Sequence, residues 1–216
     1  VFRKYLVKIN QLIETNKIKS CCFFSSLESV GKRAEYIRDG LDLELWTKNV
    51  NIILEETKSD IVVTHTNHYL SLSTIGEFVF FIKSLQKDNR IKVNFSKLVF
   101  PRYLSLDVVS KKERTFFLNQ ISKIESFLDV RSRENLHMEL ASTQNVFVRK
   151  YLRSKLKMFL TENDKRKQNV FVDIFTEHGD LVKESNYISD LSVVVVTRFA
   201  RIVKKLYKGK ELYRFF

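Results

Sequence analysis

The amino-acid sequence predicts an α/β fold in which parallel strands alternate with helices, followed by a helical region. Up to Pro101, segments with apolar residues at helical spacing alternate with short, extended apolar segments. The connections between the extended segments are not hairpin turns, so the strands pair in parallel through right-handed crossovers. After Pro101, the single proline of the 216 residues, only helical spacing continues.

The first β-α unit begins with a helix over residues 1–17, which carries apolar side chains at helical spacing. Residues 18–27 are extended and apolar and predict a strand that ends in polar residues. Helical spacing returns over 44–57, and the β-branched run 60–66 predicts the second strand.

The next unit is predicted from a capping signal and a third apolar run. Ser73 or Thr74 can cap a helix that runs to Leu85, with Glu77 in the first turn, where a carboxylate suits the helix dipole. Residues 91–100 predict the third strand. Further helices are expected at about 110–129, 145–160 and 190–208. The change of pattern predicts two domains, 1–105 and 106–216.

Polar residues follow the predicted strands at their carboxyl ends, where α/β barrels place their sites. Ser26 and Glu28 end the first strand and Asn67 ends the second. We expect the three strands to be apolar on both sides, as covered parallel strands are, with helices on one face. We also expect these three side chains to surround one open crevice, and one sheet edge to be exposed or covered by a neighbouring segment.

The chain is strongly basic, with 38 Lys and Arg against 25 Asp and Glu and a formal charge of +13. Such a surface suits phosphate binding, and the segment Arg198–Arg214 interleaves aromatic and basic residues. The sequence is also rich in Lys, Asn, Ile and Phe and poor in Gly and Pro, as an AT-biased coding sequence would make it. We interpret the charge mainly as coding bias and keep nucleic acid as a possible partner of the basic segment.

Several site classes and locations are disfavoured by the sequence. No stretch has the roughly 18 uninterrupted apolar residues of a membrane span, and no signal peptide is recognisable, so we expect a soluble, cytoplasmic protein that does not bind membranes. Cys21 and Cys22 are interpreted as a buried, reduced pair on a strand. His65 and His68 lack a third ligand at zinc spacing. The start at Val1, within a helix-spaced run, suggests a fragment of a longer polypeptide.

One stretch has the order of residues of a known family. It contains Ser26-Leu27-Glu28, then Glu35-Tyr36-Ile37-Arg38-Asp39-Gly40, then Asn49. This order resembles strand four and the following helix of radical S-adenosylmethionine enzymes with a small twitch-type extension. Glu28 stands where the family has Asp, and Ser29 stands where a glycine is expected.

Three further stretches are similar to later parts of the same family, including its phage-type members. Ile61–Phe81 resembles strand five with its helix, and Val93–Lys112 resembles strand six with the following Pro and Tyr-Leu-Ser. Leu160–Glu177 resembles part of the extension. The matching residues there are Asp164, Arg166, Asn169, Phe175 and Glu177. The resemblance covers roughly residues 1–180 in the family's own order.

The resemblance implies the C-terminal half of a partial (β/α)6 TIM-like barrel, followed by an α-rich, twitch-like extension. It implies a parent enzyme that uses S-adenosylmethionine, a [4Fe-4S] cluster and a reductant on an unknown substrate. The family holds its cluster with three cysteines in a C-x3-C-x2-C loop, which this chain lacks, so the chain alone is expected to be inactive.

Four cofactor-binding residues follow by position from the resemblance. Ser26 and Glu28 are assigned to the ribose or methionine end of S-adenosylmethionine, and Asn67 to the same cosubstrate. Arg38 is assigned to a carboxylate or to a structural ion pair. Two alternatives stay open: a basic nucleic-acid-binding or phage accessory protein without chemistry, and an inactive barrel kept as an interaction module.

Overall fold

The computed structural model describes residues 2–86, 88–141, 145–168, 170–179, 181 and 195. The chain divides into two compact units, Val1–Ser142 and Thr143–Phe216. Asn169, the segment Arg198–Arg214 and, apart from Val195, the predicted helix at 190–208 lie outside these residues. Among the residues that are described, no helix is both long and apolar enough to cross a membrane.

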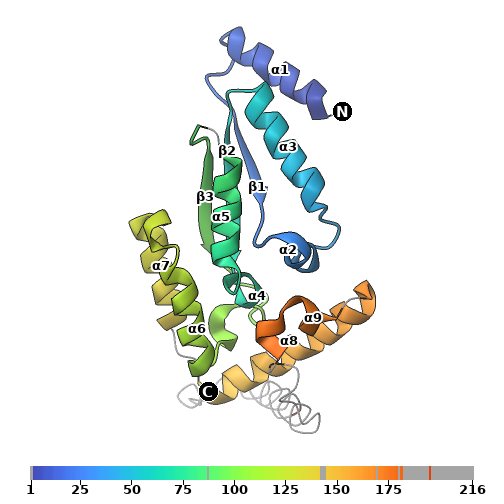
Figure 1. The fold of residues 1–216 in the computed structure, drawn as a ribbon, viewed down its shortest axis with the longest axis vertical. Coiled ribbons are helices and arrows are strands. Elements are labelled where there is room, and N and C mark those ends of the chain that lie inside the picture. The colour runs from blue at the N-terminus through green and yellow to red at the C-terminus, as the bar shows by residue number, and fades with distance from the viewer. Residues whose placement is uncertain are drawn as a thin grey trace, which may run out of the picture. The chain divides into compact units, whose positions relative to one another are not determined.

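The first unit combines a parallel sheet with helices (Figure 1). Its elements are α1 (Phe2–Glu14), β1 (Cys22–Ser26), α2 (Gly31–Ile37), α3 (Leu43–Glu56), β2 (Asp60–Asn67), α4 (Tyr69–Leu72), α5 (Ile75–Leu85), β3 (Ile91–Lys97), α6 (Lys111–Ser122) and α7 (Val130–Ala141), with single 3₁₀ turns at Leu106–Val108 and Glu125–Phe127. The second unit contains α8 (Val146–Lys167), α9 (Phe171–Ile174) and a 3₁₀ turn at Thr176–His178.

The three strands form one sheet in the order β1-β2-β3, and both neighbouring pairs are parallel. Phe23 lies beside Ile61, and Ile61 lies beside Ile91. The predicted α/β class with parallel strands is therefore confirmed, and the strand order follows the order of the chain.

The two faces of the sheet differ in burial, as β2 shows most clearly. Its residues alternate between partly exposed and buried along the whole strand. The buried residues of β2 and their neighbours in register form the covered face, some of them only partly buried: Phe23, Ser25, Ile61, Val63, His65, Asn67, Ile91, Val93 and Phe95. The others form the uncovered face: Cys22, Phe24, Ser26, Asp60, Val62, Thr64, Thr66, Lys92, Asn94 and Ser96.

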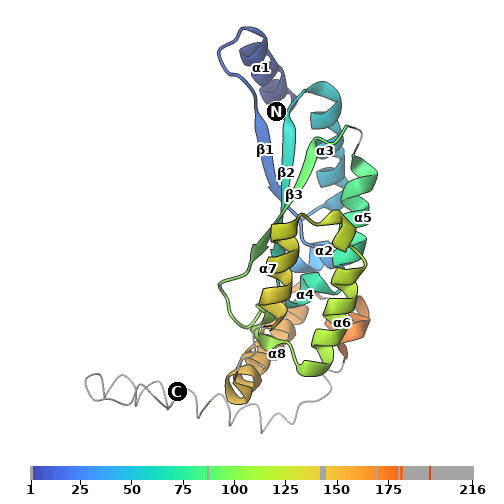
Figure 2. The same ribbon diagram turned by 90° about the vertical axis from the view of Figure 1, so that its left-hand side faces the viewer.

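Helices α3 and α5 lie on the covered face, and Figure 2 shows both on the same side of the strands. Trp46 of α3 donates from its indole nitrogen to Ser25 Oγ at 2.8 Å. The ring of Phe78 in α5 lies 4.7 Å from that of His65. On the opposite face Phe24 is 75% exposed. The expectation that each strand is covered on both sides was wrong, because polar residues such as Thr64 alternate with the apolar ones.

Local interactions fix where α3 begins and ends. Asp42 accepts a hydrogen bond from the backbone nitrogen of Leu45 at 2.8 Å and caps the amino end. Gly40, at φ +77°, supplies the left-handed turn between α2 and α3. At the carboxyl end, the Arg90 guanidinium donates to the carbonyl oxygens of Leu54, Thr57 and Ser59. The start of β3 is thereby tied to the α3–β2 connection.

Candidate functional site at the carboxyl ends of the strands

A partly buried ion pair joins the end of β1 to the end of α2. The Glu28 carboxylate is 3% exposed, and Arg38 Nε and Nη2 donate to its two oxygens at 2.6 and 2.7 Å. These hydrogen bonds raise the pKa of Arg38 above its usual range. The bidentate geometry is that of a structural ion pair, one of the two roles considered for Arg38.

His65 is buried on the covered face between the rings of Phe78 and Phe95. Its Nδ1 lies 3.1 Å from Asn67 Oδ1. Because an amide oxygen only accepts, Nδ1 carries the proton and donates. Nε2 is buried and has no hydrogen-bond partner within the described part of the chain. Burial lowers the pKa of His65 to about 4, so the ring is neutral at pH 7.

Asn67 extends this interaction to helix α7. Its side chain, 1% exposed, also hydrogen-bonds the Glu139 carboxyl group. Burial raises the pKa of Glu139, while the bond to Asn67 and the charge of Lys97 oppose that rise. His65, Asn67 and Glu139 therefore form a hydrogen-bonded chain, the His65–Glu139 chain, that crosses from β2 to α7.

His68 follows β2 and begins helix α4. Its Nδ1 accepts from the backbone nitrogen of Leu70 at 3.2 Å, and its own backbone nitrogen donates to Ser71 Oγ at 3.0 Å. Burial, with the nearby His65 and Arg38, lowers the pKa of His68 to about 3. The neutral ring thus serves as a helix cap. Among the residues that the structure describes, no group of three or more His, Cys, Asp or Glu side chains could hold a metal ion.

The three residues that were expected to surround one open crevice, Ser26, Glu28 and Asn67, do not do so. Ser26 pairs with Thr64 and belongs to the uncovered face, whereas Asn67 belongs to the covered face. Glu28 and Asn67 are both buried. Glu28 and Arg38 are in contact, Asn67 bonds to His65, and Ser26 stands apart. The error arose because strand ends were considered without the alternation of side chains between faces.

Sequence reasoning missed the roles of His65 and Glu139. The spacing of His65 and Asn67, two residues apart on one strand, indicates a shared face and was the available signal. Glu139 is 72 positions beyond Asn67 (139 − 67), and nothing in the local sequence brings α7 to β2. Its place depends on packing of the whole unit.

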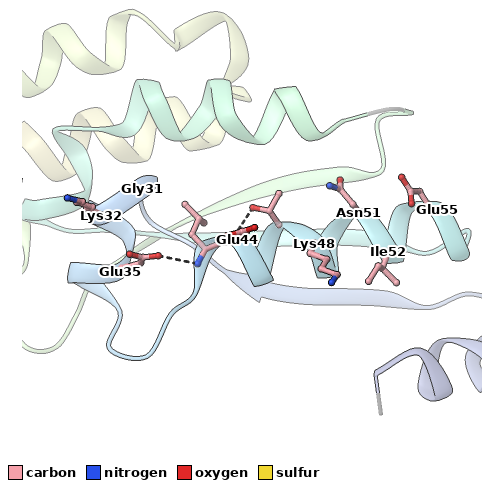
Figure 3. A pocket seen from close by; sticks show the side chains of 10 residues that line it. Gly31, Lys32, Glu35, Glu44, Lys48, Asn51, Ile52 and Glu55 are labelled. Atoms are coloured by element: carbon pink, nitrogen blue, oxygen red, sulfur yellow. Dashed lines mark hydrogen bonds between the residues drawn. The ribbon is translucent and has the colours of Figure 1, made fainter.

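A groove of about 800 Å³ lies along α2 and α3. Figure 3 shows Glu44, Lys48 and Ile52 along α3, with Glu35 of α2 near the amino end of that helix. Glu35 Oε1 accepts from the backbone nitrogen of Leu43 at 3.5 Å. The charged groups are exposed, mixed in sign and spaced one helical turn apart, as on a solvated helix face. This groove has no buried, convergent polar groups.

The cysteines do not fit an iron-sulfur cluster. Cys21 and Cys22 are adjacent, and Cys22 begins β1, at the opposite end of the strand from Ser26. Cys21 is partly exposed and Cys22 is exposed, so the expectation of a buried pair was wrong. Cluster binding by the family pattern needs three spaced thiolates. This chain's two cysteines therefore do not supply that site.

Comparison of the chain with protein-family models, with curated proteins and with solved structures finds no match.

Proposed function

We propose that this chain forms the C-terminal part of a barrel wall in a radical S-adenosylmethionine enzyme, with the uncovered face directed at the cosubstrate. The observation that supports this is the order of the strands together with the placement of the helices on one face of the sheet. Its strands follow chain order, and α3 and α5 lie on one face. A barrel has this arrangement, with helices outside and the opposite face inside, whereas doubly wound sheets carry helices on both faces.

The polar groups of the uncovered face suit a ligand rich in hydroxyl and amino-acid groups. Ser26, Thr64 and Asn94 lie side by side across the three strands. Hydroxyl and amide groups both donate and accept hydrogen bonds, as the ribose and methionine parts of the cosubstrate require. In this proposal Ser26 contacts the cosubstrate.

The other assigned residues do not contact the cosubstrate in this proposal but hold the neighbouring backbone in position. Glu28 and Arg38 hold the chain that follows β1, and Asn67 holds the end of β2 against α7. The cluster and S-adenosylmethionine supply the radical chemistry when both are bound. This chain's residues bind, orient and exclude water, and cluster ligands come from elsewhere.

Titration of the ¹⁵N-labelled chain with S-adenosylmethionine, followed by amide chemical shifts, tests the proposal. We expect the signals of Ser26, Thr64 and Asn94 to move in the millimolar range, because the cluster that anchors the methionine end is lacking. Signals of Ile61 and Val63, on the covered face, should stay in place. Ser26→Ala should weaken the response, and Ser84→Ala, an exposed serine in α5, is the matched control.

Two outcomes would contradict the proposal. The first is that no amide signal moves at about 10 mM S-adenosylmethionine, which is on the order of the weakest affinity that would be useful. The second is that only signals from the α2–α3 groove move. ATP is the control for unspecific attraction, because it is anionic whereas S-adenosylmethionine carries a net positive charge.

The second candidate function is nucleic-acid binding without chemistry, and the charge of +13 favours it. A single-stranded oligonucleotide should then bind tightly, with an affinity that falls steeply as salt rises. Such binding, together with ATP shifts larger than those of S-adenosylmethionine, would favour this candidate over the barrel wall.

A further inference from the structure

A second cavity, of about 340 Å³, lies between β3 and α7. Phe95 and Lys97 line it from alternate positions of the strand. Asn135, Met138 and Glu139 line it from one face of the helix, at spacings of three and four residues. The volume is at the lower end of the range for small-molecule sites, so the cavity suits a small ligand.

Glu139 leaves a hydrogen-bonding group unused at this cavity. Its Oε2 is buried and has no hydrogen-bond partner among the described residues. Asn67 in turn is held by His65, which fixes the carboxyl group from behind. A buried carboxylate oxygen without a donor is unfavourable, and a ligand that donates a hydrogen bond removes this deficit.

The other residues that line the cavity indicate which further groups a fitting ligand would carry. Lys97 offers a positive charge near Glu139, close enough to affect its pKa, and Asn135 offers an amide. Phe95 and Met138 add apolar surface. A fitting ligand carries a cationic donor, an anionic acceptor and a small apolar part close together.

We propose that this cavity binds a free α-amino acid with an apolar side chain. Its ammonium group donates to Glu139 Oε2, and its carboxylate accepts from Lys97 and Asn135. Its side chain lies against Phe95 and Met138. This inference does not rest on the barrel proposal, because none of these groups belongs to the uncovered face.

Calorimetric titration of the 216-residue chain with L-leucine at pH 7.5 provides the test. We expect saturable binding in the millimolar range or tighter. N-acetyl-leucine and the 2-hydroxy acid with the same side chain should bind at least about tenfold more weakly, because each loses the charged donor to Glu139. Isoamylamine, which lacks the carboxylate, should be weakened by a similar factor.

Variants locate the binding. Glu139→Gln and Lys97→Met should each weaken leucine binding about tenfold or more, with amide spectra that still show the folded chain. Glu134→Gln is the matched control, since Glu134 is an exposed carboxylate on the same helix. Affinity should also fall as the pH is lowered through the raised pKa of Glu139. Absence of leucine binding, equal binding of the hydroxy acid, or unchanged binding by Glu139→Gln would each overturn the proposal.

Discussion

The covered and uncovered faces of the sheet place the same residue types in different environments. Val62 and Val63 are neighbours on β2, yet Val63 is fully buried and Val62 is partly exposed. Polar residues differ likewise: His65 and Asn67 are buried within a hydrogen-bonded chain, whereas Thr64 and Thr66 stay partly accessible. The face on which a residue lies, rather than the mean hydropathy of its strand, decides how much the residue contributes to the stability of the fold.

Acid should produce the largest effect, and it should act through the covered face. The folded pKa of His65 is lowered from 6.5 to about 4, and that of His68 to about 3. As the pH falls from about 6.5 towards these values, the unfolded chain takes up protons that the folded chain does not. The unfolding free energy should then fall by about 3 kcal/mol through His65 and by about 5 kcal/mol through His68, measured by urea denaturation at a series of pH values.

The histidine contribution is isolated by substitution. His65→Leu should flatten part of this pH dependence, even though it lowers stability at pH 7 by leaving Asn67 Oδ1 without its donor. His137→Gln is the control, because the His137 side chain is 42% exposed. If the unfolding free energy of His65→Leu depends on pH in the same way as that of the unaltered chain, the conclusion that His65 is buried in its neutral form is wrong.

The two adjacent valines give the next largest effect and compare the faces directly. Val63→Ala removes two buried methyl groups and leaves a cavity, which should cost about 2–3 kcal/mol of unfolding free energy. Val62→Ala should cost less than about 1 kcal/mol, since that site is already partly exposed. Equal losses in the two variants would show that the uncovered face is covered in solution.

The smallest effect is expected for Phe24→Ser. Phe24 is 75% exposed on β1, so its loss should change the unfolding free energy by less than about 0.5 kcal/mol. An exposed aromatic ring on an edge strand favours association, and the variant should therefore be more monomeric in sedimentation velocity experiments. If Phe24→Ser lowered the unfolding free energy as much as Val63→Ala does, the two faces would not differ in burial as described.

The sequence predicted the elements whose signals are local. Apolar periodicity located the three strands to within a few residues at each end. Thr74 occupies the N-cap position of α5, but its side chain does not make the expected capping hydrogen bond. The first strand was extended too far towards its amino end, because Ile18 and Cys21 were taken as part of the apolar run although the polar Lys19 and Ser20 lie between them. Their place in the turn after α1 depends on tertiary packing.

The candidate site was less predictable because its geometry is not local. Ser26, Glu28, Arg38 and Asn67 do follow the strands and helix that the sequence indicated. Their separation onto two faces follows from register, which depends on all three strands at once. The partnership of Asn67 with Glu139 requires the packing of α7, which no spacing in the sequence encodes.

The sequential order of the strands has a consequence for synthesis of the chain. Cys22 pairs with Asp60, 38 positions later, and Ile61 pairs with Ile91, 30 positions later. Each strand therefore meets a neighbour made shortly before it, and no pairing has to wait for a distant part of the polypeptide. Such short separations close small loops and favour rapid folding. The sheet can assemble from its amino end while the ribosome is still adding α6 and α7.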